Sequence, residues 1–175
     1  FVSEKSERIP AGLPSLRDPD GNFYVKPEPG ALAVGGWESN TKPWGDRGIP
    51  LDFGPELLQP DYDRFEPLGT AACARIPVLN EVGIRQMING PIPITADGEP
   101  VIGLSPELDN FYLCCGFTSG IAASGGAGWV MANWIVDGDP GLDLWPFDVR
   151  RFGAPHAVKA TLYELSLELS VFVGL

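Results

Sequence analysis

Residues 111–128 spell FYLCCGFTSGIAASGGAG, an apolar run followed by a stretch made almost wholly of small residues. The run at 111–116 lies between turn signals, which predicts a buried β-strand. The small residues at 117–128 predict a loop. A helix is expected over much of 126–136, because apolar residues recur there at helical spacing and Asp137-Gly138 supplies a stop. The recurring residues are Ala127, Val130, Met131, Trp134 and Ile135.

A strand, a glycine-rich loop and a helix in this order can place backbone N–H groups against an anion. The segment lacks the Gly-Lys-Ser/Thr ending of a phosphate loop and the spacing of a dinucleotide fingerprint. A delocalised anion on a flat ring fits better, since a helix N-terminus directed at the N1 and C2=O side of reduced flavin favours reduction. On the residues alone, close packing between helix and strand explains the loop equally well.

The N-terminal part of the chain predicts short strands and one helix. Two apolar runs, 22–26 and 31–37, flank a Pro/Gly turn and predict a β-hairpin. Residues 38–60 predict a long surface loop. A helix is predicted to begin at Asp61, which is a good N-cap, and to end at Pro77. The residues expected on one face of that helix are Phe65, Leu68, Gly69, Ala72 and Ile76.

Further strand-like pieces lie at 83–89 and 92–95, with a turn at 96–100. The tail from Pro155 repeats a helical pattern of apolar residues. Together these elements predict a mixed α/β fold.

Composition narrows the possible partners. The net charge is −11, and no basic stripe is visible, so neither nucleic acid nor an anionic membrane surface is expected. No apolar run reaches the roughly 18–20 residues of a membrane span. The first residues show no signal-peptide pattern, so a cytoplasmic location is expected, with the mitochondrial matrix as the alternative.

The three cysteines, Cys73, Cys114 and Cys115, are an odd number and include an adjacent pair. This argues against a disulfide framework. They also lack the spacing of a zinc motif, so no metal site is expected. We expect them to be small buried apolar residues.

Several motifs in order carry a family resemblance. They are Asn89-Gly90-Pro91, Thr95-Ala96-Asp97-Gly98, the run 111–128, the helix segment 132–138 and the Arg-Phe motif at 143–152. From Asn89 to Phe152 the chain resembles the C-terminal, flavin-contacting part of the FAD-dependent dimethylglycine and sarcosine dehydrogenase family. Upstream, residues 18–26 resemble the substrate-domain strand of that family.

The resemblance implies part of a D-amino-acid-oxidase-type fold. Residues 1–88 would be a substrate-domain segment with a mixed sheet. Residues 89–152 would be the C-terminal part of the FAD-binding domain. Residues 153–175 lie beyond the resemblance, and their apolar pattern predicts a C-terminal helical tail. The family's first βαβ unit, with its glycine fingerprint for the FAD pyrophosphate, is absent from these 175 residues.

The FAD site is therefore expected to be incomplete in this chain. Its expected partners are an N-terminal FAD-binding segment of a parent protein and the C-terminal folate-binding domain found in many relatives. The implied reaction is oxidation of a small N-methyl amino acid, with hydride passing to the flavin. Two alternatives stay open: an amine or amino-acid oxidase of the same fold that uses oxygen, and a cofactor-free interaction module.

The resemblance also implies site residues. Tyr24 matches a tyrosine beside the flavin and the substrate amine, where a phenol can orient the amine or join a proton relay. The alternative is an ordinary strand tyrosine. Gly90 and Pro91 are expected to close over the ring. The positions matching the flavin-contacting stretch are Ser119, Gly120, Ile121, Ala122, Ala123 and Ser124.

Other polar and aromatic residues are given structural roles. His156 is expected to be a surface cap. Asp143, Asp148, Arg150 and Arg151 are expected to form a solvated turn with modest ion pairs. Trp129 and Trp134 are expected to pack in the core or at an interface.

Overall fold

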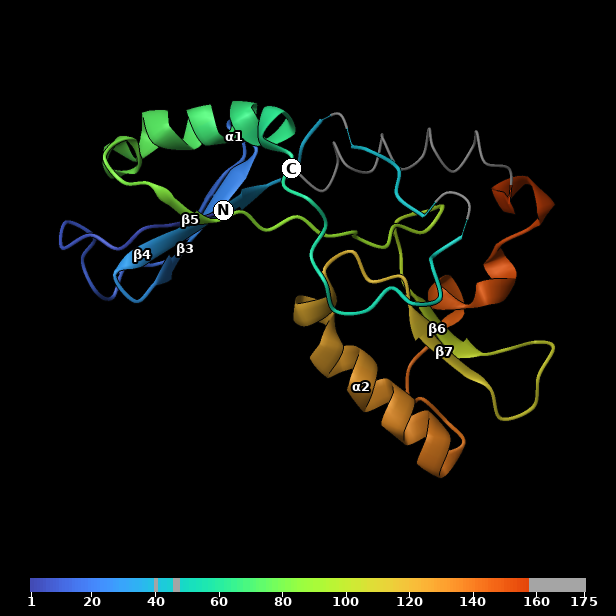
Figure 1. The fold of residues 1–175 in the computed structure, drawn as a ribbon. Helices are drawn as coiled ribbons and strands as arrows, with labels where there is room; N and C mark the ends of the chain where they lie inside the picture. Colours follow the sequence, from blue (N-terminus) through green and yellow to red (C-terminus); the bar gives the residue numbers. More distant parts are fainter. Residues whose placement is uncertain (40, 46–47, 158–175) are drawn as a thin grey trace. The chain divides into compact units, whose positions relative to one another are not determined.

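The computed structural model of the chain describes every residue except 40, 46–47 and 158–175 (Figure 1). The chain forms two compact units that meet in sequence between Pro91 and Ile92. We call residues 1–91 the sheet unit and the described residues from 92 to 157 the hairpin–helix unit. The predicted helical tail lies outside the described residues, apart from a short 3₁₀ helix at Ala154–Ala157.

The sheet unit contains a five-stranded antiparallel sheet with the strand order β2-β3-β4-β1-β5. The predicted hairpin is confirmed as β3 and β4, although Pro27 and Glu28 remain in the strand. Gly30 makes the turn at φ +73°. The strands are β1 (Val2–Ser3), β2 (Leu16–Asp18), β3 (Phe23–Glu28), β4 (Ala31–Gly36) and β5 (Ile84–Gln86).

Helix α1 (Tyr62–Arg75) lies along one face of this sheet (Figure 1). Its predicted start is confirmed, because the Asp61 side chain accepts a hydrogen bond from the Arg64 N–H at 3.1 Å and caps the helix. The 3₁₀ helix η1 (Pro77–Asn80) follows directly. The core beneath α1 is apolar and consists of Ile9, Phe23, Val25, Leu32, Val34, Ala72 and Leu79.

Strand β3 divides its side chains between two environments. Phe23 and Val25 are buried in the core, whereas Tyr24 and Lys26 are exposed. This alternation follows from the two-residue period of a β-strand. We call the side of the sheet that carries Tyr24 the Tyr24 face.

The hairpin–helix unit pairs β6 (Val101–Leu104) with β7 (Tyr112–Cys115) in an antiparallel two-stranded sheet, and α2 (Gly120–Asp137) packs beside it. Gly138 ends α2 in the left-handed conformation at φ +76°, as the sequence predicts. The 3₁₀ helices η2 (Trp145–Phe147) and η3 (Val149–Arg151) complete the unit. Its buried cluster is Ile102, Ala127, Val130, Met131 and Leu144.

The predicted loop at 117–128 is wrong over most of its length, because α2 begins at Gly120. Three of the twelve residues are alanines, and their high helix propensity partly offsets the low propensity of the four glycines. Ala127, Val130 and Met131 also pack in the buried cluster of the hairpin–helix unit, and these tertiary contacts stabilise the helix.

Two strand predictions also fail. Residues 92–95 form no strand, while Val101–Leu104, which the sequence did not single out, form β6. The predicted buried strand forms as β7, but Cys114 and Cys115 are exposed and Cys73 is only partly buried. The physical reason is that β7 pairs with a single neighbour, and the buried cluster forms around Ile102 of β6.

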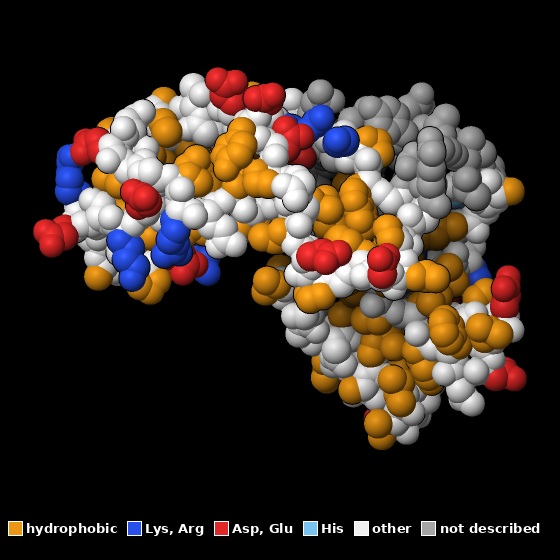
Figure 2. All heavy atoms as spheres, viewed as in Figure 1, with side chains coloured by type: hydrophobic (Ala, Val, Ile, Leu, Met, Phe, Trp, Pro, Cys, Tyr) orange, Lys and Arg blue, Asp and Glu red, His pale blue; other side chains and the backbone are white. Residues whose placement is uncertain are grey.

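Hydrophobic side chains gather over α2 with few charges among them (Figure 2). Ile121 is 96% exposed and Val136 is 80% exposed. Trp134 packs edge-on against Tyr112, with ring centroids 6.4 Å apart. Trp129 is 57% exposed and does not pack in the core, so its packing at an interface stays a prediction. Within the described part of the chain, no helix combines the length and apolar character needed to cross a membrane.

Candidate functional site

The predicted flavin-contacting residues form the N-terminus of α2. Ser119 is the N-cap residue, but its side chain makes no capping hydrogen bond. The first helical bond runs from the Ala123 N–H to the Ser119 carbonyl at 3.1 Å. The preceding N–H groups of the first turn therefore have no partner within the helix.

This helix end is electropositive and open. The first turn of α2 has no acidic side chain, so nothing on the helix itself offsets the positive end of its dipole. The side chains from Ser119 to Ser124 are small apart from Ile121, and most are exposed. A flat anionic group could thus approach the backbone N–H groups closely.

The connection from β7 to α2 is held against the loop at 93–95. Gly116 has φ +75°, and a Cβ there would lie 2.5 Å from Thr95 Cγ2, so only glycine fits. The Thr118 hydroxyl donates a hydrogen bond to the Pro93 carbonyl at 3.3 Å. The start of α2 is therefore positioned by the segment that precedes β6.

Arg151 holds the turn at 97–100 that follows this loop. Its guanidinium meets the Asp97 carboxylate through Nε–Oδ2 at 2.6 Å and Nη2–Oδ1 at 3.1 Å. It also donates to the carbonyls of Glu99 (2.7 Å), Pro100 (3.1 Å) and Asp148 (3.1 Å). The Arg151 side chain is 13% exposed. The sequence-based expectation of a modest, solvated ion pair is wrong for Arg151.

Arg150 meets that expectation on its own side, because its guanidinium is solvated, but its partner Asp148 is buried and not solvated as predicted. The Arg150 side chain is 57% exposed and pairs with Asp148, two residues away, through Nε–Oδ1 at 2.8 Å and Nη2–Oδ2 at 2.6 Å. This pair connects no distant parts of the chain. Arg150 is therefore a matched control for Arg151.

The Asp97 carboxyl has a lowered pKa. Partial burial alone would raise the pKa, but hydrogen bonds from Arg151, the Glu99 N–H and the Thr95 hydroxyl outweigh burial and hold it below its ordinary value. A carboxyl whose pKa is lower in the folded state stabilises the fold above its unfolded pKa. That stabilisation is lost as the pH falls through the folded pKa.

Replacing Asp97 with asparagine should therefore have a pH-dependent cost. We expect the difference in free energy of unfolding between the unsubstituted chain and Asp97→Asn to be largest near neutral pH and to shrink below about pH 4. Urea unfolding followed by circular dichroism between pH 7 and 3 measures this difference. A difference that stays constant or grows on acidification would show that the ionised carboxylate does not stabilise the unit.

The remaining predicted site residues belong to the sheet unit. Tyr24 lies on the Tyr24 face with its ring 5.4 Å from that of Trp37. Gly90 and Pro91 are exposed and lie outside regular structure. Asn89 anchors them to the preceding loop, since its side-chain amide donates to the Gln59 carbonyl at 2.7 Å. Their approach to a flavin ring stays a prediction.

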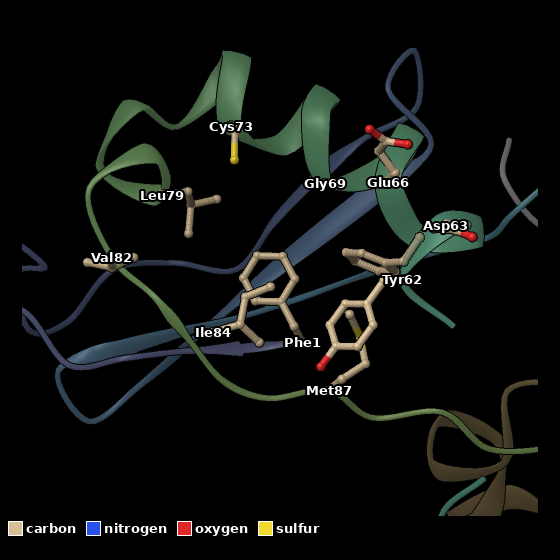
Figure 3. Close-up of a pocket in the computed structure, with 11 residues that line it drawn as sticks. Phe1, Tyr62, Asp63, Glu66, Gly69, Cys73, Leu79, Val82, Ile84 and Met87 are labelled. Carbon is tan, nitrogen blue, oxygen red and sulfur yellow. The ribbon is translucent and has the colours of Figure 1, made fainter. Parts of the chain in front are cut away.

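The sheet unit also contains a cavity of about 470 Å³ beside α1 (Figure 3). Its walls are mainly apolar, with the carboxylates of Asp63 and Glu66 on the helix side. None of the predicted site residues, all of which are described, lines it. The lining is Phe1, Tyr62, Asp63, Phe65, Glu66, Gly69, Cys73, Leu79, Val82, Ile84 and Met87.

Metal and histidine chemistry find no support in the described residues. No three His, Cys, Asp or Glu side chains come together there as a metal ion would need. His156 accepts a hydrogen bond from the Gly153 N–H through Nδ1 at 3.0 Å, which is the capping role that the sequence predicts.

The comparison with known proteins identifies the family. The model of the FAD-dependent oxidoreductase family matches residues 2–134. The chain belongs to the FAD-dependent oxidoreductase family. FAD is the cofactor of this family, and the mixed α/β fold with antiparallel sheets agrees with the predicted D-amino-acid-oxidase-type architecture.

Named relatives cover most of the chain. It is 40% identical over 152 residues to mitochondrial sarcosine dehydrogenase of Mus musculus, which is 86% of the chain and 16% of the relative. It is 37% identical to mitochondrial dimethylglycine dehydrogenase of the same species, over 81% of the chain and 17% of the relative. The mitochondrial pyruvate dehydrogenase phosphatase regulatory subunit of Mus musculus is 32% identical, over 92% of the chain and 18% of the relative. The chain thus spans less than a fifth of these proteins.

Sequence reasoning missed two residues beside Tyr24. Arg17 and Trp37 both contact this part of the Tyr24 face, and the Arg17 guanidinium carbon lies 4.9 Å from the Trp37 ring centroid. The signal available in the sequence was that Arg17 precedes a strong turn and Trp37 ends a predicted strand. Neither signal shows which residues become neighbours across strands.

Proposed function

We propose that this chain is part of an FAD-dependent oxidoreductase that oxidises a small N-methyl amino acid of the sarcosine or dimethylglycine type. The observation that carries the proposal is the open, uncapped N-terminus of α2, with small side chains and no acidic residue in its first turn. The family match and the names of the dehydrogenase relatives support it.

Bound FAD would supply the redox chemistry by accepting a hydride from the N-methyl carbon. The residues at 119–124 fit the flavin end of this cofactor, because their free N–H groups and the helix dipole favour negative charge on the ring. Tyr24 would orient the substrate amine or take part in removing its proton. Gly90 and Pro91 would close over the ring.

The domain assignment follows from these roles. Residues 1–88 would serve as a substrate-domain segment, 89–152 as the C-terminal part of the FAD-binding domain and 153–175 as a helical tail. The pyrophosphate of FAD would be held by another segment of the parent protein. A folate-binding domain would be a further partner, and the mitochondrial relatives favour the matrix over the cytoplasm as the compartment.

The test uses the full flavoprotein that contains this chain. After anaerobic mixing with sarcosine or dimethylglycine, we expect the flavin absorbance to bleach and formaldehyde to form on turnover. An artificial electron acceptor compared with oxygen separates a dehydrogenase from an oxidase. A protein that holds FAD but is reduced by no N-methyl amino acid would contradict the proposal.

Replacing Tyr24 with phenylalanine removes only a hydroxyl. In the full flavoprotein we expect Tyr24→Phe to lower the rate of flavin reduction about tenfold, as for the loss of one hydrogen bond, while FAD content stays nearly unchanged. Stopped-flow absorbance measures the rate, and the ratio of flavin to protein gives the content. A reduction rate unaltered at every pH would make Tyr24 an ordinary strand residue.

A second candidate function rests on one relative. The regulatory subunit of pyruvate dehydrogenase phosphatase matches 92% of this chain, so the same scaffold could serve as an interaction module without turnover. The flavin absorbance of the full protein, followed by its reduction with substrate, separates the two functions. A purified protein without flavin that also fails to take up added FAD would favour the interaction module.

A further inference from the structure

Gly35 leaves a gap on the Tyr24 face of β4. It lies directly opposite Tyr24 of β3, and residues opposite each other in antiparallel strands share a face of the sheet. The backbone of Gly35 lacks the positive φ that favours glycine, so a larger residue would fit the backbone there. Glycine inside a strand weakens the strand and often marks a place where another group approaches closely.

The group that approaches Gly35 is the phenol of Tyr24. A Cβ built on Gly35 would overlap both Cζ and Oη of Tyr24 and would lie 2.9 Å from Cε2. All three atoms belong to the hydroxyl end of the ring. The phenol therefore occupies the space that a side chain at position 35 would need, and it lies against β4. The position of the hydroxyl thus depends on the absence of a side chain from Gly35.

Trp37 packs against the ring of Tyr24 and is itself fixed to the neighbouring strand. The two rings lie 5.4 Å apart at an interplanar angle of 60°. The Trp37 N–H donates a hydrogen bond to the Asn22 carbonyl at 3.3 Å, and the Asn22 side-chain amide donates one back to the Trp37 carbonyl. Asn22 directly precedes β3 and has φ +54°. Two hydrogen bonds to one residue therefore anchor the Trp37 backbone beside the strand that carries Tyr24.

We propose that Gly35 and Trp37 position the Tyr24 hydroxyl for the substrate amine, Gly35 by admitting the phenol over β4 and Trp37 by keeping it there. This inference rests on the proposed function and names two positioning residues, each of which acts through Tyr24. A hydroxyl orients an amine or relays its proton only within hydrogen-bond reach, about 2.6–3.2 Å. A methyl group at position 35 would displace the hydroxyl far enough to lose that contact.

The first test needs no turnover. In NMR spectra of the 175-residue chain with isotope-labelled tyrosine rings, assigned with Tyr24→Phe, we expect a nuclear Overhauser cross-peak between the Tyr24 Hε and Gly35 Hα protons. Gly35→Ala should move the Tyr24 ring signals. Gly54→Ala is the matched control, because nothing lies within 4 Å of a Cβ at Gly54, and it should leave them in place. The cross-peak is read in the unsubstituted chain and does not depend on the folding of any variant.

The second test is a double-mutant cycle on the rate of flavin reduction in the full flavoprotein. Gly35→Ala should lower this rate about tenfold, as much as Tyr24→Phe does, with FAD content nearly unchanged. Added to Tyr24→Phe, it should lower the rate no further, because the hydroxyl that it displaces is already gone. A merely structural role would slow both backgrounds equally. Trp37→Leu should also lower the rate, whereas Trp37→Phe, which retains an aromatic ring, should recover most of it.

The two proposals can fail separately. A flavoprotein that no N-methyl amino acid reduces would disprove the proposed function, and the cross-peak between Tyr24 and Gly35 would still decide whether Gly35 places the hydroxyl. Reduction by sarcosine at an unaltered rate in Gly35→Ala, or an equal loss in both backgrounds of the cycle, would leave the proposed function standing and overturn the inference. Absence of the cross-peak, or Tyr24 signals that do not move in Gly35→Ala, would also overturn it.

Discussion

Titration of the purified 175-residue chain with FAD should show no one-to-one binding in the sub-micromolar range. FAD affinity in this family's fold has two sources, a glycine loop that holds the pyrophosphate and contacts to the flavin ring. The 175 residues contain no dinucleotide fingerprint. Hydrogen bonds to charged groups contribute roughly 1.5–3 kcal/mol each, so the lack of two or three lowers affinity by several powers of ten.

Riboflavin is the matched control, because it carries the same ring without the pyrophosphate. If only the N-terminus of α2 contacts the cofactor, riboflavin and FAD should bind this chain equally weakly, as measured by calorimetry or flavin fluorescence. Sub-micromolar FAD binding, with a clear preference over riboflavin, would show that a pyrophosphate site exists within these residues. The exposed apolar side chains of α2 should also promote self-association of the isolated chain.

Replacing Arg151 with alanine should destabilise the hairpin–helix unit by about 2–4 kcal/mol, as in other partly buried ion pairs that lose one partner. The Asp97 carboxylate and the Glu99 and Pro100 carbonyls would lose their donors together. Urea unfolding followed by circular dichroism measures the change.

Arg150→Ala removes the same charge from the neighbouring residue. It should cost less than Arg151→Ala, because the Arg150 side chain is 57% exposed and its loss frees only the nearby, buried Asp148 carboxylate and no distant segment. Equal losses in the two variants would mean that net charge, and not the network around Arg151, sets the stability. Arg151→Lys should resemble Arg151→Ala more than the unsubstituted chain, since one ammonium cannot replace the fork that meets Asp97 and three carbonyls.

Elements marked by strong local signals could be predicted from the sequence. The Pro/Gly turn defined the β3–β4 hairpin, and Asp61 with Pro77 defined the ends of α1. The start of α2 could not be predicted in this way. Its glycines suggested a loop, whereas the helix begins at Gly120 and is stabilised by alanine propensity and, from Ala127 onward, by packing with Ile102.

Some residues of the candidate site could likewise be predicted from the sequence, and others could not. The stretch at 119–124 was found because small residues before a helix have a clear chemical use, and Tyr24 was found by resemblance. Arg17 and Trp37 were missed because their proximity to Tyr24 depends on cross-strand register. Arg151 was misjudged because its partner, Asp97, lies 54 residues away. Long-range pairing of this kind leaves no periodic signal along the chain.

The alternation along β3 separates two kinds of evolutionary change. Odd-numbered positions such as Phe23 and Val25 lie in the core, so their substitution alters folding before anything else. Even-numbered positions such as Tyr24 and Lys26 face outward and can vary at little energetic cost to the sheet. Within one six-residue strand, natural variation or directed evolution can therefore change the exposed residues while the alternating buried residues keep the core intact.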